Sequence, residues 1–124
     1  MKTRAIVLFA HGARDPRWAE PFNKITERLQ SVLIDEEVRL CFLELMKPSL
    51  TDTVADIAYL GFKEITIVPL FMAQGGHLRE DLPKILAQLR EHHPEVKFHQ
   101  TSAIGDAPEL LDAIAQWVIN TTRS

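Results

Sequence analysis

The chain has 124 residues, of which 46% are hydrophobic and 25% are charged, and its formal net charge is −3. This composition is ordinary for a globular domain, and the acidic balance gives no general attraction to nucleic acid or to an anionic membrane surface. The length suits a single domain over residues 1–124, and the apolar runs fall well short of the ~18 residues of a membrane span.

The single cysteine, Cys41, excludes an internal disulfide and lies in the apolar segment VRLCFLEL, which favours a small buried side chain over a reactive thiol. The apolar run near the N-terminus is too short for a secretion signal and leads straight into charged residues. We therefore expect a cytoplasmic protein.

Four short apolar runs alternate with four longer segments along the chain. The runs are RAIVLFA (4–10), VRLCFLE (38–44), EITIVPLF (64–71) and VKFHQTSA (96–103). Short runs rich in Ile, Val and Phe are typical of β-strands. The first and third are almost continuously apolar, as expected of strands that are covered on both faces.

The segments between and after these runs repeat apolar residues every three or four positions, which predicts amphipathic helices. Their stripes, which we expect to face the core, are Trp18, Phe22, Ile25, Leu29 and Val32, then Leu50, Val54, Ile57 and Leu60, then Leu82, Ile85, Leu86 and Leu89, and finally Leu111, Ile114 and Val118. Pro16 and Pro48 precede the first two helices, Gly61 follows the second, and Asp106 is a candidate N-cap for the last.

Strands that alternate with helices imply right-handed crossovers and a parallel sheet. We expect a three-layer α/β sandwich with a four-stranded parallel sheet, built from flavodoxin-like βα repeats. Ligands of such sheets bind outside the carboxyl ends of the strands. His11 directly follows the first strand, and His77 follows the third within AQGGH. Both histidines are therefore expected at the same edge of the sheet.

Two neutral imidazoles that face one cleft suit Co²⁺, Ni²⁺, Fe²⁺ or Zn²⁺. Either imidazole can instead act as a base near neutral pH, or bond backbone groups of its own loop. The tract HHPEVKFH, residues 92–99, crosses a helix-to-strand turn, and we do not expect a metal site there.

Other common ligand motifs are absent from the sequence. It contains no G-x-G-x-x-G, no phosphate-binding G-x-x-x-x-G-K-[ST] and no G-x-S-x-G. Histidine phosphatases carry an arginine before the His-Gly of their first strand, and here that position is Ala10.

Basic residues gather near the predicted ligand edge, which suits a small ligand with several carboxylates. They are Arg14, Arg17, Lys47 and Arg79. The alternative is that Arg17 and Arg79 pair with neighbouring acids, namely Glu20, Glu80 or Asp81.

The segments HGARDPRWAEPF, FLELMKPSL and VPLFMAQGGHLREDLP resemble the small CbiX-type sirohydrochlorin chelatases, a branch of the class II tetrapyrrole chelatases. The resemblance covers nearly the whole chain. It implies the chelatase fold and insertion of Co²⁺, Fe²⁺ or Ni²⁺ into sirohydrochlorin or a close derivative without ATP. It also implies a homodimer with the site between subunits. The metal is then a substrate, and no tightly bound cofactor is expected.

The resemblance also assigns residues. His11 and His77 match the metal ligands of the family, and His11 matches its proton acceptor. The positions that match its tetrapyrrole-binding residues are Lys47, Met72, Ala73, Gln74, Gly75, Gly76 and His77. Lys47 stands where the family usually carries an acid before the proline. A charged lysine can grip a substrate carboxylate instead, and Glu44 remains as a substitute acid.

The function expected from the sequence is cobalt insertion into sirohydrochlorin, in the cobalamin or siroheme branch of tetrapyrrole synthesis. Insertion of iron or nickel is the alternative within the same class. A metal or tetrapyrrole carrier without turnover is the alternative from another class.

Overall fold

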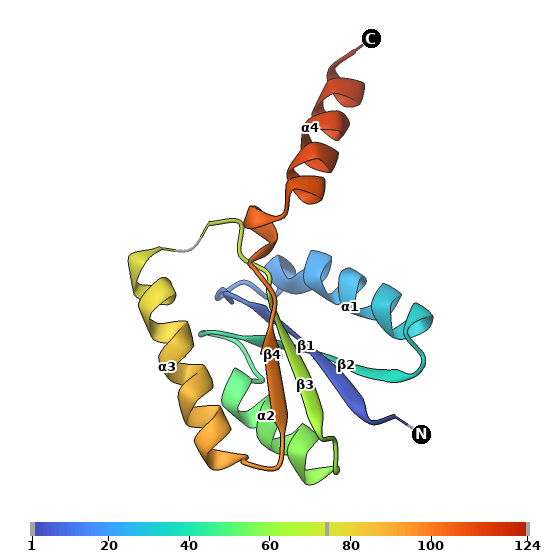
Figure 1. The fold of residues 1–124 in the computed structure, drawn as a ribbon. Coiled ribbons are helices and arrows are strands. Elements are labelled where there is room, and N and C mark those ends of the chain that lie inside the picture. Colours follow the sequence, from blue (N-terminus) through green and yellow to red (C-terminus); the bar gives the residue numbers. More distant parts are fainter. Residues whose placement is uncertain (1, 74, 124) are drawn as a thin grey trace.

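The computed structural model describes residues 2–73 and 75–123, and the side chain of His77 also lies outside its described part. Four parallel strands form one sheet in the order β2-β1-β3-β4 (Figure 1). They are β1 (Arg4–Ala10), β2 (Glu36–Phe42), β3 (Glu64–Pro69) and β4 (Lys97–Gln100). The predicted parallel sheet is confirmed. The first strand has the predicted bounds, and the others end two or three residues earlier than their apolar runs.

The helices form the two outer layers of a three-layer sandwich. Residues of α2 (Leu50–Tyr59) and α3 (Gly76–His92) pack on one face of the sheet, while η1 (Pro16–Ala19) and α1 (Glu20–Val32) pack on the other. A short turn, η2 (Ile104–Asp106), follows β4 and leads into α4 (Pro108–Thr122). In Figure 1, α4 projects away from the sheet instead of lying on it.

Local signals account for both ends of α2. Ser49 caps α2 by accepting a hydrogen bond from the amide of Asp52 at 3.1 Å. Gly61 follows α2 at a φ of +96°, a left-handed conformation that favours glycine. Asp106 is not the cap of α4: it belongs to η2, and Ala107 occupies the cap position without a side-chain bond.

The main core lies between the sheet and the α2 and α3 helices. Ile65 and Ile67 of β3 are fully buried there, as are Val54 and Ile57 of α2. The predicted stripe of α3 is confirmed by its contacts with this core. The stripe of α2 is confirmed except for Leu60, which follows the helix and is exposed.

Two of the predicted stripes do not face the core throughout. On α1, Ile25 and Val32 are exposed, and the buried position is Thr26, whose hydroxyl donates to the carbonyl of Phe22 at 2.8 Å. In α4 the structure buries no side chain, so the expectation that its stripe joins the core of this chain is wrong. The period of 3.6 residues shows that a helix has an apolar face, but it does not specify what covers that face.

Among the described residues, no helix combines the length and apolar character that crossing a membrane requires.

Candidate functional site

The pairing of β1 with β2 continues past the ends of both strands. The amide of Leu43 donates to the carbonyl of Ala10 at 2.8 Å, and the amide of Glu44 donates to the carbonyl of His11 at 3.0 Å. These two bonds hold the loops after β1 and β2 side by side. They place His11 and Glu44 next to each other at the carboxyl edge of the sheet.

Gly12 allows this close approach of the two loops. Its φ is +99°, which side chains other than hydrogen rarely tolerate. A Cβ atom at this position would collide with the carbonyl oxygen of Glu44. The glycine that follows His11 therefore fixes where Glu44 lies.

The side chains of His11 and Glu44 form a hydrogen-bonded pair. Nε2 of His11 lies 2.8 Å from Oε1 of Glu44, and both side chains remain about half exposed. Because an ionised carboxylate only accepts hydrogen bonds, Nε2 of a neutral imidazole carries the proton in this pair. The lone pair of such an imidazole is then on Nδ1. Carboxylate oxygen and imidazole nitrogen are both common ligands of divalent metals.

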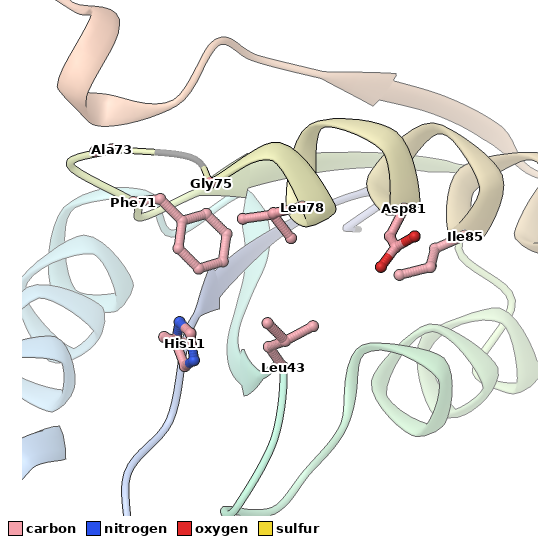
Figure 2. A pocket seen from close by; sticks show the side chains of 8 residues that line it. All are labelled: His11, Leu43, Phe71, Ala73, Gly75, Leu78, Asp81 and Ile85. Carbon is pink, nitrogen blue, oxygen red and sulfur yellow. The ribbon is translucent and has the colours of Figure 1, made fainter.

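A cavity of about 290 Å³ opens beside His11 (Figure 2). Its walls are mostly apolar and come from the ends of β1 and β2, the loop after β3, and α3. The lining residues are His11, Leu43, Phe71, Ala73, Gly75, Leu78, Asp81 and Ile85. Figure 2 shows His11 on one side of Phe71 and Leu78, and the carboxylate of Asp81 further along α3 near Ile85.

Phe71 connects the pocket to the core. Its ring packs edge-on against Phe9, with centroids 5.5 Å apart, and stands nearly perpendicular to the His11 ring at 6.3 Å. Its carbonyl accepts a hydrogen bond from the amide of Gly105 at 3.0 Å. A Cβ on Gly105 would collide with the backbone of Met72. The loop after β4 thus packs directly against the loop after β3.

The predicted substrate-binding loop lies only partly in the pocket. Ala73 and Gly75 line it, whereas Met72 is 53% exposed and Gly76 is the first residue of α3. Gln74 lies outside the described residues. His77 belongs to the first turn of α3, but its side chain is outside the described part. Its convergence with His11 therefore stays a prediction.

Lys47 is exposed and is absent from the pocket lining. Its role in substrate binding also stays a prediction. Glu44, which the sequence left as a substitute acid, is the residue that contacts His11. The signal that identifies it is its position two residues beyond β2, because backbone bonds between the loops that follow β1 and β2 bring Glu44 against His11.

Arg17 is held by a neighbouring acid. Its guanidinium bonds both carboxylate oxygens of Asp15, at distances down to 2.7 Å, so the predicted pairing with an acid is found but the partner is not Glu20. The bond from Arg17 lowers the pKa of Asp15 below its ordinary value, and Asp15 in turn raises the pKa of Arg17. Because Asp15 already engages it, Arg17 has less capacity to bind a ligand carboxylate.

The described side chains contain no group of three or more His, Cys, Asp or Glu residues that could hold a metal ion. The pair of His11 and Glu44 offers one nitrogen and one oxygen donor at this edge of the sheet. Elsewhere, His99 lies 2.9 Å from Glu64 at the start of β3, away from the pocket.

These features define a class of protein. A doubly wound parallel sheet carries a histidine–carboxylate pair at its carboxyl edge, beside an apolar pocket, which is where α/β domains of this kind bind small ligands. Within that class, the chain belongs to the CbiX family, whose model matches residues 5–121.

Several similar proteins are described as enzymes. A sirohydrochlorin cobaltochelatase of Methanococcus aeolicus is 36% identical over 90 residues, which are 72% of this chain and 63% of that protein. One of Methanopyrus kandleri is 37% identical over 82 residues, which are 66% of this chain and 57% of that protein. The chain thus spans less than two thirds of the length of these relatives.

Solved structures share the fold. A Marinobacter aquaeolei VT8 protein described as a CbiX protein of cobalamin (vitamin B12) biosynthesis is 36% identical, with a TM-score of 0.82 over 95% of this chain and 96% of that one. The sirohydrochlorin chelatase SirB of Bacillus subtilis subspecies spizizenii, solved in complex with cobalt, is 22% identical. Its TM-score is 0.80 over 97% of this chain and 51% of that one.

Proposed function

We propose that the chain is a sirohydrochlorin chelatase that inserts a divalent metal, with Co²⁺ as its main substrate, within cobalamin or siroheme synthesis. Membership of the CbiX family and the similarity to two sirohydrochlorin cobaltochelatases support this reaction. The observation that carries the proposal is the bonded pair of His11 and Glu44 at the mouth of an apolar pocket.

The pair is suited to bind a metal and, once the metal has left, to accept protons. Nε2 of His11 and Oε1 of Glu44 lie 2.8 Å apart, and when the proton of the neutral imidazole moves to Nδ1 they offer a divalent cation one nitrogen and one oxygen donor. His77, in the first turn of α3, is the proposed third ligand. Neutral imidazole and carboxylate ligands release a metal more readily than a thiolate cage, and Co²⁺, Fe²⁺ and Ni²⁺ all accept them.

Proton balance gives His11 its catalytic role. Insertion of M²⁺ into the macrocycle expels two pyrrole N–H protons, and the groups that have just released the metal are free to accept them. An imidazole has an ordinary pKa near 6.5 and takes up a proton readily at neutral pH. His11 is thus the proposed proton acceptor, and Glu44 orients its ring and shares the positive charge.

The pocket shape suits one part of a flat macrocycle. Leu43, Phe71 and Leu78 offer an apolar wall, and Ala73 and Gly75 leave room for close approach. A volume of about 290 Å³ is at the small end of ligand pockets, which hold roughly 300–1,000 Å³. A tetrapyrrole therefore needs a second wall, and we assign it to a second copy of the chain in a homodimer.

The remaining substrate contacts are assigned to the predicted loop over residues 72–77 and to Lys47. Lys47 is exposed near the end of β2, where an ammonium can meet a peripheral carboxylate of the substrate. The reducing cytoplasm is the proposed compartment, which suits the free thiol of Cys41.

The test is anaerobic incubation with sirohydrochlorin and Co²⁺, Fe²⁺ or Ni²⁺ separately, following the change in absorption. We expect the highest kcat/KM with Co²⁺. His11→Ala and Glu44→Gln should lower it by about 10²-fold or more, the range of general acid–base catalysis. Glu27→Gln removes an exposed carboxylate on α1 and should change nothing.

Three outcomes contradict parts of this proposal. Faster turnover with Fe²⁺ or Ni²⁺ reassigns the metal. Full activity in His11→Ala and Glu44→Gln overturns the site. Binding of sirohydrochlorin without turnover by any metal overturns the enzyme and identifies a carrier.

A further inference from the structure

Leu45 directly follows the carboxylate that contacts His11, and its backbone is strained. Its φ is +66°, and among the described residues no residue other than glycine has a positive φ. The amide of Met46 donates to the carbonyl of Glu44 at 2.8 Å, which closes a three-residue turn with Leu45 at its centre. Such a turn with a positive φ is rare and strained, and glycine adopts it at the lowest cost. A leucine here therefore lowers the stability of the fold.

Both neighbours of Leu45 are held by the rest of the site. The amide of Glu44 donates to the carbonyl of His11 at 3.0 Å, and its carboxylate contacts the His11 ring. Met46 packs against the apolar cluster that includes Phe42. The left-handed backbone of Leu45 joins these two anchored residues. Strain of this kind persists only where surrounding contacts outweigh it, and it is concentrated at functional sites.

The side chain of Leu45 takes no part in holding the turn. The side chains on either side of it contact His11 and the core, whereas Leu45 is 59% exposed. Because hydrophobic stabilisation scales with the apolar area removed from water, folding of this chain gains little from Leu45. An exposed leucine alone is ordinary. One that is also held in a strained conformation beside the metal-binding pair indicates a contact with a ligand.

The geometry of metal transfer brings the macrocycle to this side chain. A metal held by His11 and Glu44 must pass to the centre of the ring, so the ring centre lies close to this pair during insertion. Neighbouring Cα atoms are about 3.8 Å apart. A tetrapyrrole extends farther than this from its centre, so the residue next to Glu44 lies within reach of the ring. The face of the ring is apolar, which suits a leucine side chain.

We infer that Leu45 is a substrate-contacting residue, whose side chain packs on the apolar face of the tetrapyrrole next to the point of metal transfer. The inference rests on the proposed chelatase function. The left-handed turn keeps Glu44 against His11 and leaves the following side chain free to contact the ring. This contact is present before and after the metal enters, so Leu45 contributes to binding and not to the chemical step.

Leu45→Gly tests the inference, because it changes stability and binding in opposite directions. Glycine relieves the strain, partly offset by its greater freedom in the unfolded chain, and we expect the midpoint of thermal unfolding to rise by about 3 °C. The Kd for metal-free sirohydrochlorin, measured anaerobically by absorption with a chelator present, should rise about tenfold. Co²⁺ binding should stay native, since the turn that holds Glu44 is retained. Leu45→Met keeps the strain and the apolar contact, so both values should stay near native.

Ile34→Gly is the matched control. Ile34 is 70% exposed in the turn before β2, at the opposite end of that strand from Leu45, and its φ is not positive. The variant removes a similar apolar surface without relieving any strain. We expect a native Kd for sirohydrochlorin and a midpoint of unfolding that does not rise.

Three results overturn the inference. A native Kd for sirohydrochlorin in Leu45→Gly would show that the side chain does not touch the substrate. A midpoint of unfolding that falls as it does in Ile34→Gly would show that the backbone is not strained. A Kd for sirohydrochlorin that rises only where sedimentation shows a loss of association would assign the side chain to a contact between two copies of the chain.

Turnover separates this inference from the proposed reaction. If the native protein binds sirohydrochlorin but inserts no metal, the chelatase is removed, and a raised Kd in Leu45→Gly still supports the contact. If the native protein inserts metal and Leu45→Gly keeps the native Kd and KM, the contact is removed and the chelatase remains. Where both hold, KM rises in Leu45→Gly while kcat stays nearly unchanged.

Discussion

Replacing Gly12 by alanine tests how the site is built, because Gly61 provides a matched control. The two glycines have nearly the same backbone, with φ values of +99° and +96°. A Cβ at position 61 meets no atom within 4 Å, whereas a Cβ at position 12 collides with the carbonyl of Glu44. Both substitutions carry the cost of a left-handed residue, and only Gly12→Ala must also displace the neighbouring loop.

The expected losses follow from these two terms. A left-handed side chain costs about 1–2 kcal/mol, partly offset by the reduced entropy of the unfolded chain. Gly61→Ala should therefore lower the free energy of unfolding by about 1 kcal/mol. Overpacking adds roughly 1–3 kcal/mol. Gly12→Ala should lower it by about 3 kcal/mol, and the midpoint of thermal unfolding should fall by about 8 °C more than in the control.

Urea unfolding followed by circular dichroism measures both variants at one protein concentration. In parallel, Gly12→Ala should weaken Co²⁺ binding, because the loop that carries Glu44 moves, while Gly61→Ala should bind as the native protein does. Equal stability losses in the two variants, or unchanged metal binding in Gly12→Ala, would refute the view that this glycine positions Glu44.

Two further predictions concern ionisable groups outside the pocket. Burial raises the pKa of Cys41 to about 12, so at pH 8 roughly one thiol in 10⁴ is ionised. A disulfide reagent should therefore label Cys41 only when the protein unfolds. Fast labelling of the folded protein would contradict this prediction. Burial alone would raise the pKa of Glu37, but hydrogen bonds from Arg39 and Lys2 outweigh it and the pKa falls below its ordinary value. The stabilisation from Glu37 is therefore present above its ordinary pKa of about 4.3 and lost as the pH falls through the folded value. Glu37→Gln should flatten the acid side of the stability profile, and an unchanged profile between pH 5 and 2 would exclude the ion pair as its source.

The alternation of strands and helices was sufficient to predict the sheet. The run RAIVLFA is β1 without any change of bounds, because residues 5–10 are all apolar and charged or polar residues lie on both sides. The place of His11 also followed from topology, since any residue just after a parallel strand lies at the carboxyl edge. These inferences depend only on local pattern and on rules of connection.

The contact between His11 and Glu44 needed more than pattern. It depends on a backbone bond between the loops that follow the two strands and on a glycine that allows their close approach, and neither is visible in the spacing of residues. The partner of Arg17 was missed for a related reason: Asp15 lies in the irregular turn before η1, whereas helical spacing pointed to Glu20. For α4, the spacing of apolar residues identified the apolar face correctly, but the spacing does not specify what packs against that face.

The strand order also shapes how the chain emerges during synthesis. The central strand β1 is made first, yet both of its neighbours are made later, β2 at residues 36–42 and β3 at residues 64–69. The edge of this almost wholly apolar strand that pairs with β3 must therefore stay unpaired until more than half of the chain has left the ribosome. Such a segment is prone to associate with other unfinished chains. Arg4 at its first position, and Arg14 and Asp15 after it, place charges at both ends, which opposes that association while β1 waits for its partners.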